Sequence, residues 1–183
     1  VGLSITEQGG RFLEAPVSGS RKPAEDGTLL FLCAGDQSLL EEIRPALDVM
    51  GKTVHFLGPV GQGARMKLVI NMIMGGMITA FAEGLALADK AGIAADDLFA
   101  VLDGGVLANP LFRVKGPRMA AGDFAPAFPL KHEKKDLRLA LQLGEELTLS
   151  LPTATAANAA FLRAMNAGCG DEDFSAVLKA IRS

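Results

Sequence analysis

The segment Gly61–Lys90 reads GQGARMKLVINMIMGGMITAFAEGLALADK and decides the fold class of the chain. Its apolar residues recur with helical spacing along the whole segment, which predicts one long helix. Lys67 and Asn71 stand four residues apart near its start, so a helix places an ammonium and an amide on one face. The uncharged part, Leu68–Ala82, is shorter than the roughly 20 residues that a membrane span needs. We therefore expect a buried globular helix and no membrane partner.

This helix is apolar nearly all round, so other helices or a second subunit should enclose it. Gly75 and Gly76 lie in its middle, where each costs roughly 1 kcal/mol of helix propensity relative to alanine. Glycine is reasonable there if another backbone or a ligand must come close.

Composition indicates a globular protein with a substantial core. The chain has 183 residues, 49% of them apolar and 21% charged, and its formal net charge is −3. No basic cluster accompanies aromatic residues, which argues against nucleic-acid binding. Cys33 and Cys169 lie far apart and in no metal-type spacing, so we expect no metal site and a buried Cys33.

The two parts of the chain differ in the elements that their patterns predict. Before Gly61 the sequence predicts strands at 11–16, 28–34 and 54–57 and a helix at 36–50, which Pro45 could kink or split. This order is typical of the closing part of an α/β sheet. After Gly61 only helices are expected, at residues 61–90, 96–102, 110–121, 131–147, 152–167 and 174–181.

We therefore expect two domains, 1–60 and 61–183. The first residues, VGLSITEQGG, lack a starting methionine and are typical of the end of a helix that Gly9-Gly10 closes. On this basis we expect the chain to be a fragment of a longer protein.

The first candidate site motif is Ala15-Pro-Val-Ser-Gly-Ser20, where a strand runs into a loop of small residues. Small side chains let backbone N–H groups point at an anion such as a carboxylate. Ser18 adds a hydroxyl donor, and Arg21 and Lys22 raise the local positive potential. The alternative is an ordinary strand-to-turn connection, which these residues alone favour.

The second motif is Gly58-x-x-Gly61-x-Gly63-x-x-x-Lys67-x-x-x-Asn71. Its glycines predict a tight turn into a helix N-terminus, which suits anions. It is not the G-x-G-x-x-G of a dinucleotide fold, because no βαβ unit follows. A lysine in the first turn opposes the helix dipole. It either donates a proton to a carbonyl oxygen while Asn71 fixes the geometry, or is a snorkelling surface lysine.

The third motif combines Phe128 with the pair Lys135-Asp136 on a predicted helix. From the pattern alone such a pair indicates a solvated face. His132, four residues before Asp136, is expected to be a surface partner rather than a catalyst.

Taken together, these motifs resemble the β-hydroxyacid dehydrogenase family. F-L-E-A-P-V-S-G-S followed by A-E-D-G-T-L resembles its substrate-binding signature, and G-x-x-G-x-G-A-R-M-K-L-V-I-N-M resembles its catalytic signature. K-K-D-L-R-L-A resembles its cofactor-contact signature. The resemblance implies closing strands of a Rossmann-type sheet, followed by a 6-phosphogluconate-dehydrogenase-like helical C-terminal domain built on one long helix.

The resemblance also implies an activity. S-G-S-R-K-P-A-E-D-G, N-M-I-M-G and P-A-F-P-L-K-H are similar to the plant-type glyoxylate/succinic semialdehyde reductase branch. That branch implies the NADPH-dependent reduction of a small aldehyde-acid to the hydroxy acid. The roles implied at matching positions are a catalytic acid, Lys67; an orienting residue, Asn71; substrate-binding residues Ser18, Gly19, Phe128 and Asp136; and a cofactor contact, Lys135.

One feature departs from the family pattern. The glycine-rich dinucleotide fingerprint is missing, so we expect NADPH to be bound mainly by an N-terminal part absent from this chain. The residues present carry no determinant that separates NADPH from NADH. We expect negligible activity from these 183 residues alone.

The expected partners are a small-molecule substrate and further copies of the chain in a homodimer or homotetramer. The expected compartment is the cytoplasm, or a chloroplast or mitochondrion if a targeting segment precedes Val1. One alternative is a catalytically silent relative, like the nuclear dehydrogenase-like proteins that lack the catalytic lysine, although the presence of Lys67 favours an enzyme. A second alternative is a helical dimerisation module without a ligand.

Overall fold

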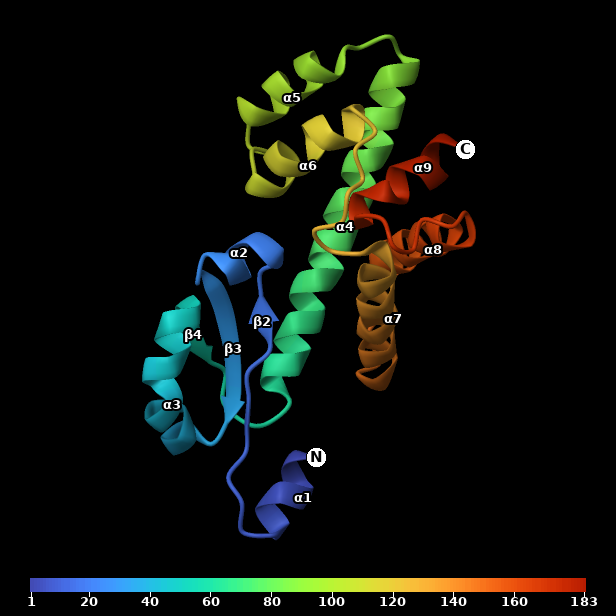
Figure 1. Ribbon diagram of the computed structural model, residues 1–183. Helices are drawn as coiled ribbons and strands as arrows, with labels where there is room; N and C mark the ends of the chain where they lie inside the picture. Colours follow the sequence, from blue (N-terminus) through green and yellow to red (C-terminus); the bar gives the residue numbers. More distant parts are fainter. The chain divides into compact units, whose positions relative to one another are not determined.

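The computed structural model describes residues 1–183, which form two compact units, Val1–Ile70 and Asn71–Ser183. Helix α4 contributes its first residues to unit 1 and the rest to unit 2 (Figure 1). Unit 1 contains α1 Gly2–Glu7, β1 Leu13–Glu14, β2 Val17–Ser18, α2 Arg21–Glu25, β3 Leu29–Gly35, α3 Gln37–Met50, β4 Gly51–Phe56 and the start of α4 Gln62–Lys90. Unit 2 adds α5 Ala95–Asp103, α6 Pro110–Ala120, α7 Leu130–Glu146, α8 Pro152–Asn166, the 3₁₀ turn η1 Phe174–Ala176 and α9 Val177–Arg182.

The sheet of unit 1 is organised around β3 (Figure 1). Strands β1 and β2 both pair with it in antiparallel fashion, and β4 pairs with it in parallel. The middle of β3 is buried, as its continuous apolar sequence predicts. Cys33 has no exposed surface, so the prediction of a buried thiol is confirmed, and burial raises its pKa.

The strand predicted at 11–16 is wrong in its extent. Pairing with β3 is interrupted at Ala15-Pro16 and resumes at Val17, because proline has no N–H to donate to the ladder. The Pro16 carbonyl still accepts a hydrogen bond from the Leu32 N–H at 2.8 Å, so the chain stays alongside β3. The two short strands therefore form one interrupted edge.

Two further local expectations are corrected. Helix α2 was not predicted, because a five-residue segment with a proline at its third position gives too little periodicity. Strand β4 begins at Gly51, three residues before the predicted start. Helix α3 runs unbroken with Pro45 inside it, and the Asp36 carboxylate caps its start by accepting from the Leu39 N–H at 2.9 Å.

Unit 2 is entirely helical, which confirms the predicted fold class of an α/β part followed by an all-α part. One face of α4 enters its core, where Ile78, Phe81, Ala82 and Leu85 are buried. The cluster around them draws its members from the later helices and the 3₁₀ turn, among them Met119, Leu137, Phe161, Phe174 and Leu178.

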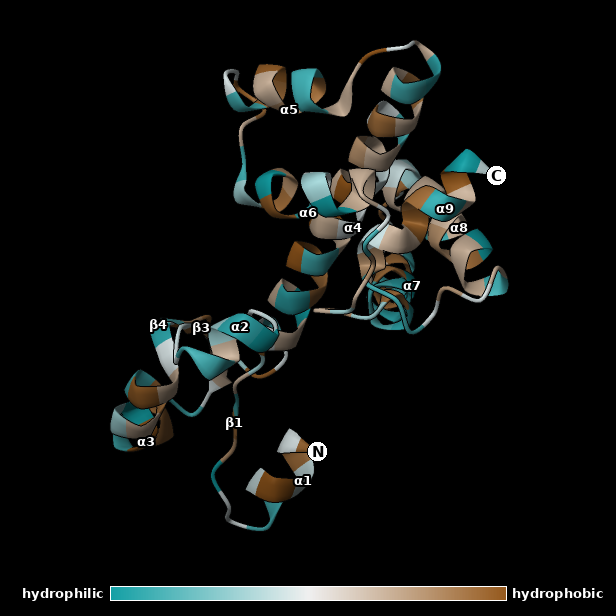
Figure 2. Cartoon of the chain, turned by 45° about the horizontal axis from the view of Figure 1, so that its top comes forward, coloured by the Kyte–Doolittle hydropathy of each residue, from teal (hydrophilic) through white to brown (hydrophobic).

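The other face of α4 remains exposed within this chain. Ile73 is 52% exposed and Leu87 is 71% exposed, and Figure 2 shows apolar colours along most of the helix. By length and composition alone α4 could cross a membrane. Core helices of soluble proteins meet the same criteria, and Ile78 and Leu85 of α4 are buried in the core of unit 2. Helices of the same chain therefore cover only one face of α4, and the expected enclosure of the other face by a second subunit stays a prediction.

The adjacent glycines Gly75 and Gly76 in α4 have different environments. A Cβ atom at Gly75 would lie 2.5 Å from Glu133 Oε1 and 3.1 Å from both δ-carbons of Leu137, so helix α7 occupies that space. At Gly76 the nearest atom to such a Cβ is a Thr153 methyl at 4.0 Å. The close approach expected from the sequence therefore exists at Gly75 alone.

This difference predicts opposite effects of the same substitution. Gly75→Ala should lower the free energy of unfolding by about 1–3 kcal/mol, because Glu133 and Leu137 are buried and must move. Gly76→Ala should raise it by up to ~1 kcal/mol through helix propensity. Urea denaturation of both variants measures this, and equal effects would contradict the assigned packing of α7 on α4.

Candidate functional site

The N-terminus of α4 holds an anion that belongs to the chain itself. Glu14 Oε1 accepts hydrogen bonds from the backbone N–H groups of Gly61 and Gly63, each at 2.8 Å. The prediction that this glycine turn suits an anion is correct in its chemistry. The Glu14 carboxylate already occupies the position, so the turn is not a phosphate-binding site.

Lys67 lies one helical turn after Gly63, in the second turn of α4. The expectation that it occupies the first turn is therefore wrong, because α4 begins at Gln62. Its side chain is half-buried, which distinguishes it from Arg65 and Met66, the exposed residues that precede it. The lysine thus stands on a helix whose start is fixed by hydrogen bonds to Glu14.

Ser18 and Gly19 lie where β2 ends. Ser18 is half-buried and pairs with Leu30 of β3, and Gly19 follows with φ +128°. A Cβ at Gly19 would lie 2.9 Å from a Leu29 methyl and 3.0 Å from Pro23 Cβ, so both the backbone angle and the space require glycine. The loop of small residues is shorter than expected, since β2 extends through Ser18 and leaves only Gly19 and Ser20 before α2.

Asn71, Asp136 and Lys135 form a polar cluster in unit 2. Asn71 Nδ2 donates to Asp136 Oδ2 at 2.6 Å, and both residues are buried. Lys135 Nζ donates to the other carboxylate oxygen at 2.5 Å. The solvated-face interpretation is therefore wrong for Asp136, although half of the Lys135 side chain is exposed. Because a carboxylate only accepts hydrogen bonds, this contact fixes which way the Asn71 amide points.

Phe128 is held by a carboxylate that sequence reasoning missed. Asp173 Oδ2 accepts from the backbone N–H groups of Ala127 and Phe128, at 3.1 and 3.3 Å. The same carboxylate accepts from Lys115 Nζ at 2.7 and 2.8 Å and from Ser175 Oγ at 2.7 Å. Lys115 is 6% exposed and Asp173 only 1% exposed, so this is a buried ion pair.

The Phe128 side chain is itself half-buried and packs on aromatic neighbours. Its ring meets Phe174 edge to face, with centroids 5.9 Å apart, and lies 6.1 Å from the ring of His132. His132 is exposed, as expected for a surface partner. The role of Asp173 could not be predicted from its local sequence, because its partner Lys115 lies 58 residues away. Locally, Asp173 is recognisable only as an acidic residue before the last helical segment.

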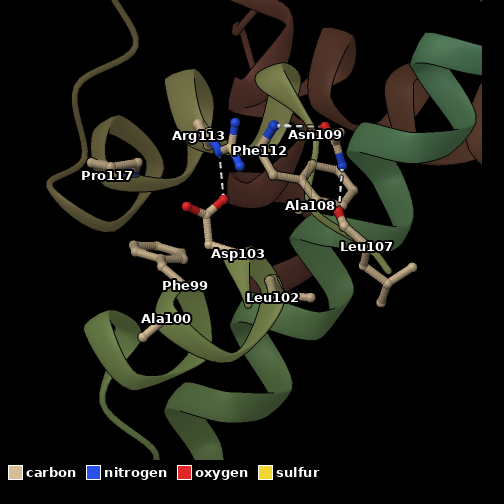
Figure 3. Close-up of a pocket in the computed structure, with 10 residues that line it drawn as sticks. All are labelled: Phe99, Ala100, Leu102, Asp103, Leu107, Ala108, Asn109, Phe112, Arg113 and Pro117. Atoms are coloured by element: carbon tan, nitrogen blue, oxygen red, sulfur yellow. Dashed lines mark hydrogen bonds and ion pairs between the residues drawn. The ribbon is translucent and has the colours of Figure 1, made fainter. Parts of the chain in front are cut away.

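Two cavities occur in unit 2, and none of the predicted site residues lines either of them. One, of about 260 Å³, lies between α5 and α6, where the Arg113–Asp103 ion pair and Asn109 border apolar side chains (Figure 3). The other, of about 460 Å³, lies between α4 and residues 150–154. Their linings are mainly apolar, which differs from the polar cluster around Asp136.

Residues 61–181 match the family model for the NAD-binding region of NADP-dependent 3-hydroxyisobutyrate dehydrogenase. The chain belongs to the 3-hydroxyisobutyrate dehydrogenase family. Residues 3–58 match the model for the NAD-binding domain of 6-phosphogluconate dehydrogenase. Membership in the 3-hydroxyisobutyrate dehydrogenase family confirms the resemblance that the three sequence motifs carry.

Relatives of known name share most of this chain. Glyoxylate/succinic semialdehyde reductase 1 of Arabidopsis thaliana is 58% identical over 98% of the chain, and the chloroplastic reductase 2 is 50% identical over all of it. The human cytokine-like nuclear factor N-PAC is 43% identical over 96% of the chain. The chain spans 62%, 51% and 32% of the lengths of these three relatives.

A solved structure supports the same fold. The 3-hydroxyisobutyrate dehydrogenase of Salmonella typhimurium is 31% identical and superimposes with a TM-score of 0.89 over 97% of this chain and 63% of its own. An α/β part followed by helices around one long helix is therefore the fold of this 3-hydroxyisobutyrate dehydrogenase family member.

The Lys115–Asp173 pair gives a stability prediction. Asp173→Asn should lower the free energy of unfolding by about 3–5 kcal/mol, because it leaves the Lys115 ammonium buried without its counter-charge. The control is Asp171→Asn, which removes an exposed partner of Lys131 and should leave stability unchanged. Urea titrations of the two variants compare them, and equal losses would contradict the importance of burial.

The same pair predicts an acid-sensitive contribution to stability. Burial acts to raise the pKa of Asp173, but hydrogen bonds from Lys115 and Ser175 and the Lys115 charge outweigh it, so the pKa lies below the ordinary 3.8. A carboxylate with a lowered folded-state pKa stabilises fully above the unfolded value and loses that contribution as pH falls through the folded value. The stability difference between wild type and Asp173→Asn should therefore shrink below about pH 3.8.

Proposed function

We propose that this chain is the substrate-binding and proton-donating part of a reductase that converts a small aldehyde-acid, glyoxylate or succinic semialdehyde, to its hydroxy acid with NADPH. The observation that carries the proposal is the half-buried Lys67, one turn before Asn71, whose amide is oriented by the buried Asp136. The reductase names of the two Arabidopsis relatives support it.

Lys67 acts as the general acid. Reduction of an aldehyde places negative charge on the carbonyl oxygen, and an ammonium that donates to this oxygen stabilises that charge and then supplies the proton. Asn71 orients the reacting group with its amide. Its contact with Asp136 at 2.6 Å fixes the amide, so little rearrangement is needed when the substrate binds.

The other substrate contacts divide by chemistry. Ser18 and Gly19 hold the substrate carboxylate through the serine hydroxyl and the backbone that the left-handed glycine exposes. Asp136 and Phe128 are proposed as further substrate-binding residues because their positions match the family's substrate-binding pattern. The hydrogen bonds from the Ala127 and Phe128 N–H groups to Asp173 hold that aromatic residue in place.

The residues present do not form a cradle for the pyrophosphate of a dinucleotide. The one glycine-rich turn that leads into a long helix already binds the Glu14 carboxylate, whose charge would repel a phosphate. We infer that residues outside this chain hold most of NADPH and that Lys135 contributes a contact from α7. A chain of these 183 residues alone should accordingly show negligible reductase turnover.

The decisive substitution is Lys67→Met in the full-length protein. It should lower kcat for glyoxylate and succinic semialdehyde by roughly 10²–10⁴-fold, because the proton donor and its charge are both lost. Arg65→Met, which removes an exposed cation from the same helix, serves as the control and should keep wild-type rates. Steady-state assays that follow NADPH oxidation test this, and wild-type turnover in Lys67→Met would refute the assignment.

The apolar surface supports a second function as an assembly module. Ile73 and Leu87 lie on one face of α4 and are 52% and 71% exposed. An uncovered apolar helix face of this kind marks an interaction site. We propose that a second copy covers this surface in a homodimer or homotetramer. The rival to the enzyme is a catalytically silent assembly role, and it is supported by the 43% identity to a relative that is named as a nuclear factor and not as an enzyme.

Light scattering with size-exclusion chromatography tests assembly directly. The chain should elute as a dimer or larger, and Ile73→Glu should shift it toward monomer because a charge is placed on an apolar contact. A strictly monomeric wild-type chain would contradict assembly through this surface.

The compartment is a separate proposal. We place the protein in the cytoplasm, a chloroplast or a mitochondrion, and the chloroplastic relative supports the second of these.

A further inference from the structure

Glu14 connects two motifs that lie far apart in the sequence. It precedes the Ala15–Ser20 segment directly, and its carboxylate accepts the two N–H groups at the start of α4. Ser18 follows Glu14 by four residues, and Lys67 follows Gly63 by the same distance. The hydrogen bonds therefore link the strand that carries the predicted anion loop to the helix that carries the predicted proton donor.

The geometry around Gly63 makes this link tight. A Cβ at Gly63 would lie 2.3 Å from the Leu32 carbonyl oxygen, 3.1 Å from Glu14 Oε1 and 3.3 Å from Pro16 Cδ. The start of α4 thus rests directly on β3, the strand to which β1 and β2 both pair. Only a residue without a side chain allows this contact.

We propose that Glu14 is a positioning residue for Lys67, holding the helix that carries the ammonium in register with the Ser18–Gly19 carboxylate site. This inference rests on the proposed function. Two charge-assisted hydrogen bonds to one oxygen fix the first turn of α4 both along the helix axis and in its rotation about that axis. Because α4 is rigid over one further turn, the position of Lys67 follows from them.

The conformational effect can be measured without reductase activity. In the 183-residue chain, Glu14→Ala should shift the amide signals of Gly61 and Gly63 in ¹⁵N NMR spectra. It should also shift the side-chain signals of Lys67 in lysine-labelled protein. Lys90, at the other end of α4, is the internal control, and Glu41→Ala, an exposed glutamate on α3, is the control variant.

Turnover in the full-length protein supplies a second readout. Glu14→Ala should lower kcat by about 10–100-fold, the size expected for a misplaced catalytic group. Glu14→Gln keeps an acceptor oxygen at the same reach and should recover most of this loss. Glu14→Asp keeps the charge but is one methylene too short for both N–H groups, so it should recover less than Glu14→Gln.

The outcomes separate the possible failures. If Glu14→Ala lowers stability while the Lys67 signals and kcat stay at wild-type values, Glu14 only caps the helix and the proposal is overturned. If Glu14→Ala does not fold, wild-type Lys67 signals in Glu14→Asp overturn it equally. If the wild-type protein has no reductase activity, the proposed function fails, and the Lys67 spectra still decide whether Glu14 positions this side chain.

Discussion

The packing of helix α4 depends on two of its glycines, Gly63 and Gly75. At Gly63 its backbone lies against a carbonyl oxygen of the central strand, and at Gly75 it makes room for Glu133 and Leu137 of α7. In each compact unit, α4 therefore packs on its neighbour through a glycine. A side chain at either position would push the helix away from that neighbour. The propensity lost at these two glycines is offset by packing that a regular helix surface could not make.

In both units, buried or half-buried carboxylates hold backbone and side-chain N–H groups near the proposed site residues in fixed positions. Glu14 holds the start of α4, Asp136 holds the Asn71 amide, and Asp173 holds the backbone at Phe128. In each case an acceptor-only group meets N–H donors, so the direction of every contact is fixed. Glu14 and Asp173 thus support residues proposed for substrate chemistry without a proposed substrate contact of their own, whereas Asp136 is itself proposed to bind substrate.

Sequence patterns predicted the features that local spacing determines. The long helix, the buried strand β3 and the helix that starts at Pro152 follow from periodicity and from the fixed φ of proline. The placement of Lys67 and Asn71 on one face of α4 was also predicted from their four-residue spacing. The capping role of Glu14 and the Lys115–Asp173 pair were not, because their partners lie 47 to 58 residues away in sequence. No local pattern encodes such a contact.

The interruption at Pro16 also has a consequence for solubility. One side of β3 is covered by two strands of only two residues each, which are separated by Ala15 and Pro16. Long, flat edge strands invite a strand from another molecule to add to the sheet, and short broken edges discourage this. The segment that leads to Ser18 therefore also protects this margin of the sheet against intermolecular strand addition and aggregation.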